Sequence, residues 1–158
     1  MSLTHGITPL GVHDIDTGDC LPVKNKTYRL SDKVKDSIQQ EVAKMLELGV
    51  IEPSSSLWSR PVVLVPKVAA PGTAPGLQFC VDYRGLNSVT KTDAHPIPRA
   101  DELVDRLGAA TFLSTFDLTS GYLKVSLTEG ANERSAISTP KRHFHFTVMP
   151  FGLKNAPP

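Results

Sequence analysis

The sequence feature that most limits how this chain can fold is an acidic residue at the end of an apolar run. Asp117 closes the segment TFLSTFD (111–117) and is followed at once by the turn-forming residues Thr-Ser-Gly. A carboxylate beside a packed core is costly unless it is paired, hydrogen-bonded or bound to a cation. Two explanations are open. In the first, Asp117 is a cap, whose carboxylate accepts hydrogen bonds from the backbone N–H groups of the following turn. In the second, it is a metal ligand at the end of a strand, with the amides of 118–122 facing a phosphate.

The surrounding apolar pattern predicts an α+β fold, in which helices are segregated from antiparallel strands. Val34, Ile38 and Val42 recur at helical spacing, which predicts one amphipathic helix over 31–48 that ends at Gly49. The other expected elements are a hairpin between 62–66 and 77–83, a hairpin between 134–139 and 143–148, a short helix at 99–108, and an antiparallel pair of strands at 112–117 and 122–127.

Composition and charge exclude several classes of protein. The 158 residues are 40% hydrophobic and 21% charged, as in ordinary globular domains, and the net charge of +1 gives no strong global field. The longest apolar runs are too short to span a bilayer, and the N-terminus lacks the layout of a signal peptide. Cys20 and Cys80 fit no metal or disulfide spacing, so we expect reduced thiols in an intracellular protein, cytoplasmic or nuclear. His143 and His145 have a spacing that can ligate zinc, but no third ligand is near in sequence, so we do not expect a metal there.

Several blocks of sequence together point to one family. FCVDYRGLNSVT, HPIPRADELVDRLGAATFLSTFDLTSGY and FTVMPFGLKNAP occur in this order, and HDIDTGDCLPVKNKTYRLS, MLELGVIEPSSSLWSRPVVLVPK and STPKRHFHF accompany them. These blocks closely resemble the fingers and first palm segment of reverse transcriptases from gypsy-type long-terminal-repeat retrotransposons. The resemblance covers about residues 13–157. It implies an α+β, partial right-hand polymerase, truncated before the Tyr-x-Asp-Asp hairpin, with an incomplete reverse-transcriptase domain at 31–158. Residues 1–30 carry Gly, Pro and Asp with little periodicity, which predicts an extended arm.

The resemblance also implies a role for individual residues. Asp117 would be the first of the family's three catalytic aspartates and, with the backbone carbonyl of Leu118, a ligand of Mg²⁺, for which Mn²⁺ could substitute. Tyr122 occupies the position whose ring excludes ribonucleotides. The implied nucleotide-binding positions are Lys67, Gln78, Leu118, Thr119, Ser120, Gly121, Tyr122 and Phe151, and the implied template-binding positions are Asp82, Arg84, Asn87, Gly152 and Lys154.

Several of these positions also have a plain structural explanation. Asp82 and Arg84 could form a strand-end ion pair that stabilises a turn, although a guanidinium also suits phosphate recognition. Phe151 could be a core aromatic before a turn, and an exposed lysine such as Lys67 is ordinarily only solvated. The other aromatic residues expected in the core, rather than stacked on bases, are Trp58, Tyr83, Phe112 and Phe116.

The chain departs from the family pattern at four places. Gln78 stands where an Arg commonly holds the triphosphate, and the loop VAAPGTAPG (68–76) replaces a shorter, basic turn. Arg142 stands where the family often has Gly. The sequence ends in NAPP where the family continues NAPATFQ, and it contains no Tyr-x-Asp-Asp motif, which supplies the other two carboxylates.

The expected function follows from the resemblance and from these departures. The complete parent protein would add deoxynucleotides to a primer on an RNA or DNA template with two Mg²⁺ ions, and would also carry RNase H. With one of three metal carboxylates, this chain alone is expected to be inactive, with no metal bound tightly. Two alternatives remain: a non-catalytic module that binds nucleic acid, and a transposon relic without activity. The small net charge predicts a modest affinity for nucleic acid, which falls steeply as the salt concentration rises.

Overall fold

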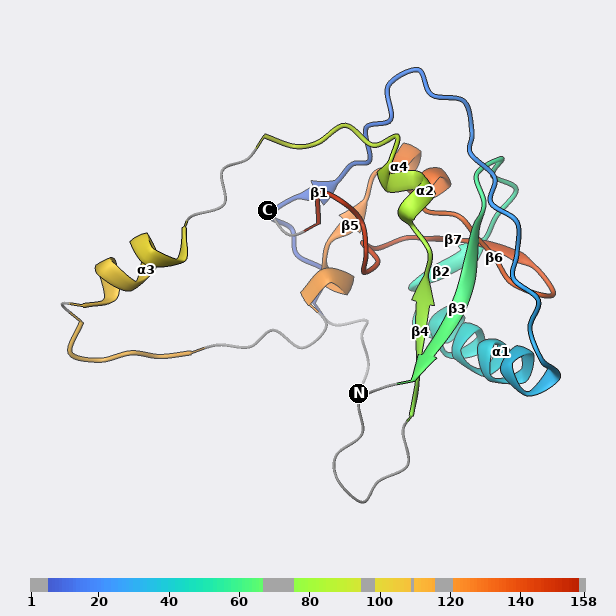
Figure 1. Cartoon of the computed structure of the whole chain (residues 1–158), viewed down its shortest axis with the longest axis horizontal. Coiled ribbons are helices and arrows are strands. Elements are labelled where there is room, and N and C mark those ends of the chain that lie inside the picture. The colour runs from blue at the N-terminus through green and yellow to red at the C-terminus, as the bar shows by residue number, and fades with distance from the viewer. Residues whose placement is uncertain (1–5, 67–75, 95–98, 109, 116–120, 157–158) are drawn as a thin grey trace.

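A computed structural model describes residues 6–66, 76–94, 99–108, 110–115 and 121–156 (Figure 1). The helices are α1 (Asp32–Glu47), α2 (Arg84–Asn87), α3 (Ala100–Leu107) and α4 (Glu129–Arg134), with a 3-10 turn, η1, at Gly121–Lys124. The strands are β1 (Val12–His13), β2 (Ile51–Pro53), β3 (Arg60–Pro66), β4 (Leu77–Val81), β5 (Ser126–Leu127), β6 (Ile137–Ser138) and β7 (His143–Phe146). The fold is therefore a mixture of helices and a sheet, as the sequence predicts.

A mixed five-stranded sheet forms the centre of the body, in the order β2-β7-β6-β3-β4. The β3–β4 hairpin is confirmed, with Val62 opposite Val81 in an antiparallel register. The β6–β7 hairpin is confirmed as well, with Ile137 opposite Phe144. Phe144 and Phe146 are both buried, because alternate residues of β7 face the core. The parallel pairing of β3 with β6 joins the two hairpins into one sheet.

Helix α1 packs against this sheet and follows the predicted spacing closely. Ile38 and Val42, one helical turn apart, are its buried residues. Gly49, just beyond the helix, has a φ of 67°, a left-handed conformation that glycine adopts without steric cost. Helix α1 contacts β2 and β3, which places its apolar side over the sheet (Figure 1).

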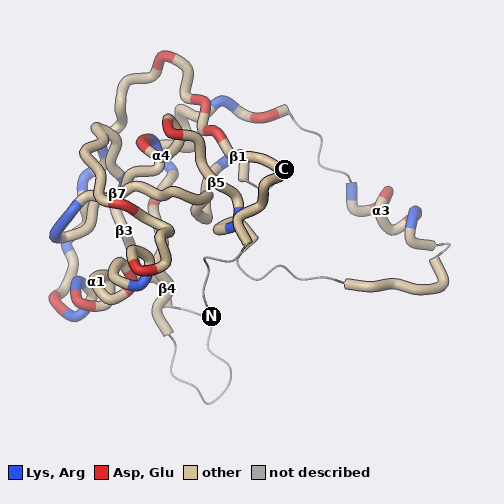
Figure 2. Tube along the Cα trace, turned by 180° about the vertical axis from the view of Figure 1, so that it is seen from behind, with Lys and Arg blue, Asp and Glu red and all other residues tan. Residues whose placement is uncertain are grey.

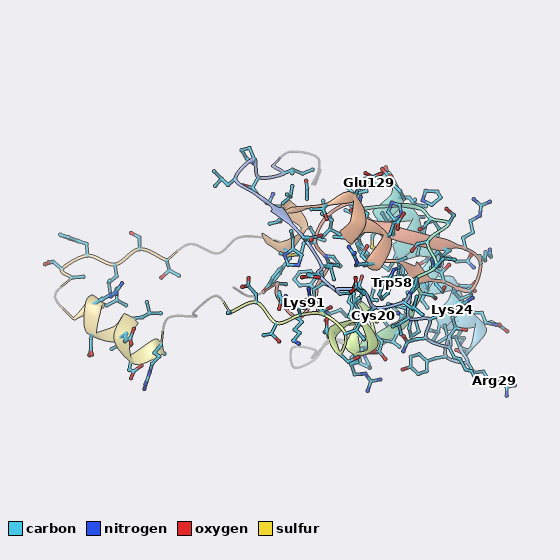
Figure 3. The ribbon with its side chains drawn as sticks, turned by 90° about the horizontal axis from the view of Figure 1, so that it is seen from above. Cys20, Lys24, Arg29, Trp58, Lys91 and Glu129 are labelled. Atoms are coloured by element: carbon cyan, nitrogen blue, oxygen red, sulfur yellow. The ribbon has the colours of Figure 1, made fainter. Side chains whose placement is uncertain are left out.

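The N-terminal segment lies along the body instead of extending away from it. Strand β1 pairs in parallel with β5, and Ile15 is only 2% exposed within the core. Further along, Lys24 forms a bridge with Ser59, and the buried Arg60 Nη1 donates to the carbonyl of Val23. Figure 3 shows Cys20, Lys24 and Arg29 in sequence across the body toward its right-hand edge.

The segment from 110 to 127 differs from the expected pair of strands. Residues 112–115 form no strand, residues 116–120 lie outside the described residues, and 121–124 form η1. Among the described residues of this segment, Ser126–Leu127 is the one strand, and it pairs in parallel with β1. In a strand, Tyr122 and Val125 would lie on opposite faces, whereas the three-residue period of a 3-10 turn puts Tyr122 and Val125, just beyond its end, on one side. Both side chains pack against the core, and the Val125 N–H donates to the Tyr122 carbonyl at 3.2 Å.

Helix α3 confirms the predicted helix at 99–108, but it stands apart from the body (Figure 1, left). None of its residues is buried. Phe112, expected in the core, is 92% exposed, so that expectation is wrong, whereas Trp58 and Tyr83 are buried as predicted and Phe116 lies outside the described residues. Phe112 follows α3 in a segment, 110–115, whose residues are all exposed, so it has no core to enter. Among the described helices, none is long and apolar enough to cross a bilayer.

Candidate nucleic-acid interface

A mainly apolar cavity of ≈ 300 Å³ lies between β4, the 150–152 turn and the end of α1. Gln78, Phe151 and Gly152, three of the residues singled out from the sequence, are in its wall. Cavities that bind small molecules are commonly apolar with a few polar groups for orientation. The other lining residues are Met45, Val50, Phe79, Cys80, Val81, Leu123, Phe146 and Pro150.

Tyr122 joins this group through Phe151. The two rings meet edge to face, with centroids 5.0 Å apart and an interplanar angle of 68°. Phe151 is 55% exposed, so one side of its ring faces solvent. Gly152 has a φ of 93°, where a side chain would be strained even though a Cβ would meet Tyr83 only at an ordinary contact distance of 3.7 Å. The turn therefore favours glycine for its backbone conformation.

The side chain of Asn87 fixes the turn that carries Phe151 and Gly152. Its Nδ2 donates to the Gly152 carbonyl at 2.8 Å, and its Oδ1 accepts from the Lys154 N–H at 3.0 Å. The Lys154 ammonium donates to the Thr90 carbonyl at 3.0 Å. Asn87 and Lys154 thus lie beside the candidate site, but these polar groups are used within the protein.

Asp82 and Arg84, beyond the end of β4, form a bidentate ion pair. Arg84 Nε donates to Oδ1 at 2.9 Å and Nη2 to Oδ2 at 2.7 Å. This contact with Arg84 holds the pKa of the Asp82 carboxyl well below its usual range. Since the pKa is depressed on folding, the pair contributes stability above the pKa of an unfolded Asp and loses it only in stronger acid. The Arg84 side chain is 84% exposed, whereas that of Asp82 is 12% exposed.

Tyr28 belongs to the same cluster, although no pattern in the sequence selects it. Its hydroxyl donates to Asp82 Oδ2 at 2.8 Å and accepts from Arg84 Nη2 at 3.3 Å. Tyr28 and Asp82 are 54 residues apart in sequence, and Tyr28 lies in a segment without periodicity. Only the folded arrangement reveals the contact.

The family of the chain follows from comparison with known proteins. Residues 69–158, more than half of the chain, match the family described as reverse transcriptase (RNA-dependent DNA polymerase). The chain belongs to the reverse transcriptase family. The matched residues include the cavity wall formed by Gln78, Phe151 and Gly152.

Proteins similar to this chain include Pol polyproteins of transposons and enzymatic polyproteins of viruses. The chain is 37% identical over 137 residues to the retrovirus-related Pol polyprotein from transposon 412 of Drosophila melanogaster. The aligned residues cover 86% of the chain and 11% of that relative. The resemblance to retrotransposon Pol proteins is therefore confirmed. The chain spans about a tenth of the length of this relative.

Solved reverse transcriptases share its fold. The prototype foamy virus protease–reverse transcriptase, as a selenomethionine-labelled CSH mutant, is 27% identical with a TM-score of 0.76, over 92% of this chain and 19% of that one. The foamy viral protease–reverse transcriptase in complex with an RNA/DNA hybrid is 26% identical with a TM-score of 0.74, over 96% and 20% of the two chains.

Several residues selected from the sequence lie outside the part of the chain that the structure describes. They are Lys67, Asp117, Leu118, Thr119 and Ser120. Gly121, which follows them, begins η1 and is half-buried. Their implied roles stay predictions.

Charge and possible metal ligands are dispersed over the described residues. Figure 2 shows acidic and basic residues interspersed along the trace, with both signs on α1 and on α3. Within the described ranges, no group of three or more His, Cys, Asp or Glu side chains could hold a metal ion. The two histidines of β7 contact different serines: His143 Nδ1 lies 3.0 Å from Ser138 Oγ, and His145 Nδ1 lies 3.0 Å from Ser54 Oγ.

Proposed function

We propose that this chain is the part of an RNA-directed DNA polymerase that contacts the incoming deoxynucleotide and the template strand. The observation that carries this proposal is the convergence of Gln78, Tyr122, Phe151 and Gly152 on one cavity and its rim. They come from three separate segments of the chain, and the family motifs imply a nucleotide or template role for each of them. Residues that only filled the core would have no reason to line one cavity and also to match the family's nucleotide-binding and template-binding positions.

In this proposal, residues 31–158 are the fingers and the opening of the palm, and residues 1–30 are an arm, whose described part (6–30) packs along them. The cavity beside β4 receives the nucleotide, with Phe151 and Tyr122 at its rim. Gln78 is polar but uncharged, so it can hydrogen-bond a triphosphate without the charge of the Arg that the family commonly has. Hydrogen bonds to charged groups contribute about 1.5–3 kcal/mol. We therefore expect Gln78 to bind a nucleotide more weakly than an Arg at this position, by a free energy on this scale.

Asp117 is proposed as the catalytic carboxylate and metal ligand, together with the Leu118 carbonyl. Divalent ions, Mg²⁺ in our proposal, would activate the primer hydroxyl and stabilise the leaving pyrophosphate. The described residues do not themselves fit a metal, since they hold no suitable cluster of ligands. The remaining carboxylates would come from a Tyr-x-Asp-Asp motif, which the 158 residues do not contain.

Arg84 supplies the test of the nucleic-acid role, because its exposed guanidinium suits a phosphate of the template. We expect Arg84→Ala to weaken binding of an RNA/DNA primer–template by about tenfold at low salt, the loss of roughly 1.5 kcal/mol from a charged hydrogen bond. The slope of log K against log salt should fall by about 0.9, the value for one phosphate contact on a duplex. Fluorescence anisotropy over a series of salt concentrations measures both quantities.

Arg106→Ala is the matched control, since it removes the same charge from an exposed position on α3. It should leave the affinity and the salt slope nearly unchanged. Arg84→Ala also frees the Asp82 carboxylate, so the double variant Asp82→Asn with Arg84→Ala separates the lost contact from new repulsion. Equal effects of Arg84→Ala and Arg106→Ala would show only a general charge effect and would contradict a template contact at Arg84.

A further inference from the structure

The side chain of Tyr28 connects the N-terminal arm to the Asp82–Arg84 ion pair. Its hydroxyl lies between the two partners, donating to Asp82 Oδ2 at 2.8 Å and accepting from Arg84 Nη2 at 3.3 Å. Tyr28 is 45% exposed, so burial alone does not fix its side chain, and its hydroxyl makes these two hydrogen bonds. A tyrosine that only filled the core would have no reason to place its hydroxyl between these two charged side chains.

The contacts leave one end of the Arg84 guanidinium open to solvent. Nε and one N–H of Nη2 bind Asp82, and the second N–H of Nη2 reaches Tyr28. Within the described residues, Nη1 donates no hydrogen bond, and the Arg84 side chain is 84% exposed. The two N–H groups of Nη1 are therefore the ones that can meet an external phosphate.

Asp82 is held in place on both of its oxygens. Oδ1 accepts from the Arg84 backbone N–H at 3.2 Å and from Nε, while Oδ2 accepts from Nη2 and from the Tyr28 hydroxyl. Without the hydroxyl, Oδ2 keeps only the arginine as a partner, and the guanidinium loses a fixed neighbour. A free arginine must then be ordered when it binds, which lowers affinity because side-chain rotamer entropy is lost at that step.

We propose that Tyr28 is a positioning residue, whose hydroxyl fixes the Arg84 guanidinium so that Nη1 faces a phosphate of the bound nucleic acid. This inference rests on the proposed function, in which Arg84 contacts the template. It adds that the N-terminal arm takes part in nucleic-acid binding through Arg84, without touching the nucleic acid itself at Tyr28. The ring of phenylalanine preserves the packing and removes only the hydroxyl.

A double-variant cycle on the whole 158-residue chain tests the inference. Tyr28→Phe is made alone and together with Arg84→Ala, and the affinity for an RNA/DNA primer–template is measured by anisotropy over several salt concentrations. We expect Tyr28→Phe alone to weaken binding about two- to tenfold, the range of one hydrogen bond. The salt slope should stay unchanged, because no charge is lost. In the Arg84→Ala background, Tyr28→Phe should have no further effect.

Ser37→Ala is the control, since it removes an exposed hydroxyl that donates to the Lys33 carbonyl on α1. It should not change affinity in either background. A loss of affinity from Tyr28→Phe that is equal in both backgrounds would overturn the inference, because it would show a structural role independent of Arg84. No loss from Tyr28→Phe, where Arg84→Ala does weaken binding, would overturn it too. If Arg84→Ala itself has no effect, the template contact proposed for Arg84 fails first, and the positioning role fails with it.

Discussion

Primer extension is expected to fall by about a thousandfold or more when Asp117 is replaced by Asn in a chimera of this chain with a relative. The chimera joins residues 1–158 to the palm and thumb segments of a reverse transcriptase that contains the Tyr-x-Asp-Asp motif. An amide cannot replace the negative charge that holds a divalent cation, and metal stabilisation of transition-state charge is worth several kcal/mol. About 4 kcal/mol corresponds to a thousandfold change in rate. Gel analysis of extended primers gives the rate.

Asp36→Asn in the same chimera is the matched control, because Asp36 is an exposed acid on α1. It should leave the extension rate within about twofold. The Asp117→Asn chimera should still bind primer–template and should melt cooperatively, since the substitution nearly preserves size. A folded Asp117→Asn chimera that extends primers at the unsubstituted rate would contradict the proposed catalytic role.

The free energy of unfolding is expected to fall by about 3–5 kcal/mol in Phe146→Ala, the range for removal of a buried Phe. Phe146 is 4% exposed, lies opposite Ile51 in the β2–β7 pair, and lines the cavity beside β4. Its loss removes apolar contacts between the sheet and the site. Because single domains are stable by only about 5–15 kcal/mol, this change should bring the chain close to unfolding. Urea denaturation followed by circular dichroism measures the change.

Phe112→Ala makes the same substitution at a side chain that is 92% exposed. Its effect should stay within about 0.5 kcal/mol, as for other surface substitutions. Comparable losses from Phe146→Ala and Phe112→Ala would show that the core does not pass through β7 as described.

Elements with a long, regular pattern could be predicted from the sequence. The apolar spacing predicts a helix at 31–48, and α1 spans Asp32–Glu47. The prediction is close because the spacing defines the helical segment and Gly49 marks its end. The β3–β4 hairpin is equally clear from its two runs of β-forming residues, which flank a loop rich in Pro and Gly. In both cases, the signal is local, so neighbouring residues suffice to define the element.

Pairings between distant short segments could not be predicted. Strands β1 and β5 have two residues each, too few for any periodicity, and their parallel pairing depends on the folded arm. The same limit applies to the candidate site. Family motifs select Gln78, Phe151 and Gly152, whereas Tyr28 reaches Asp82 across 54 residues and acquires its place only in the fold.

Template-directed extension by the unsubstituted chimera tests whether this chain supplies part of a polymerase active site. A labelled DNA primer annealed to an RNA template is incubated with Mg²⁺ and one deoxynucleotide at a time, and the bare 158-residue chain is assayed in parallel. We expect the chimera to add only nucleotides complementary to the template and the bare chain to add none. A chimera that is folded and binds the primer–template but does not extend it, or extension by the bare chain, would contradict the proposed function.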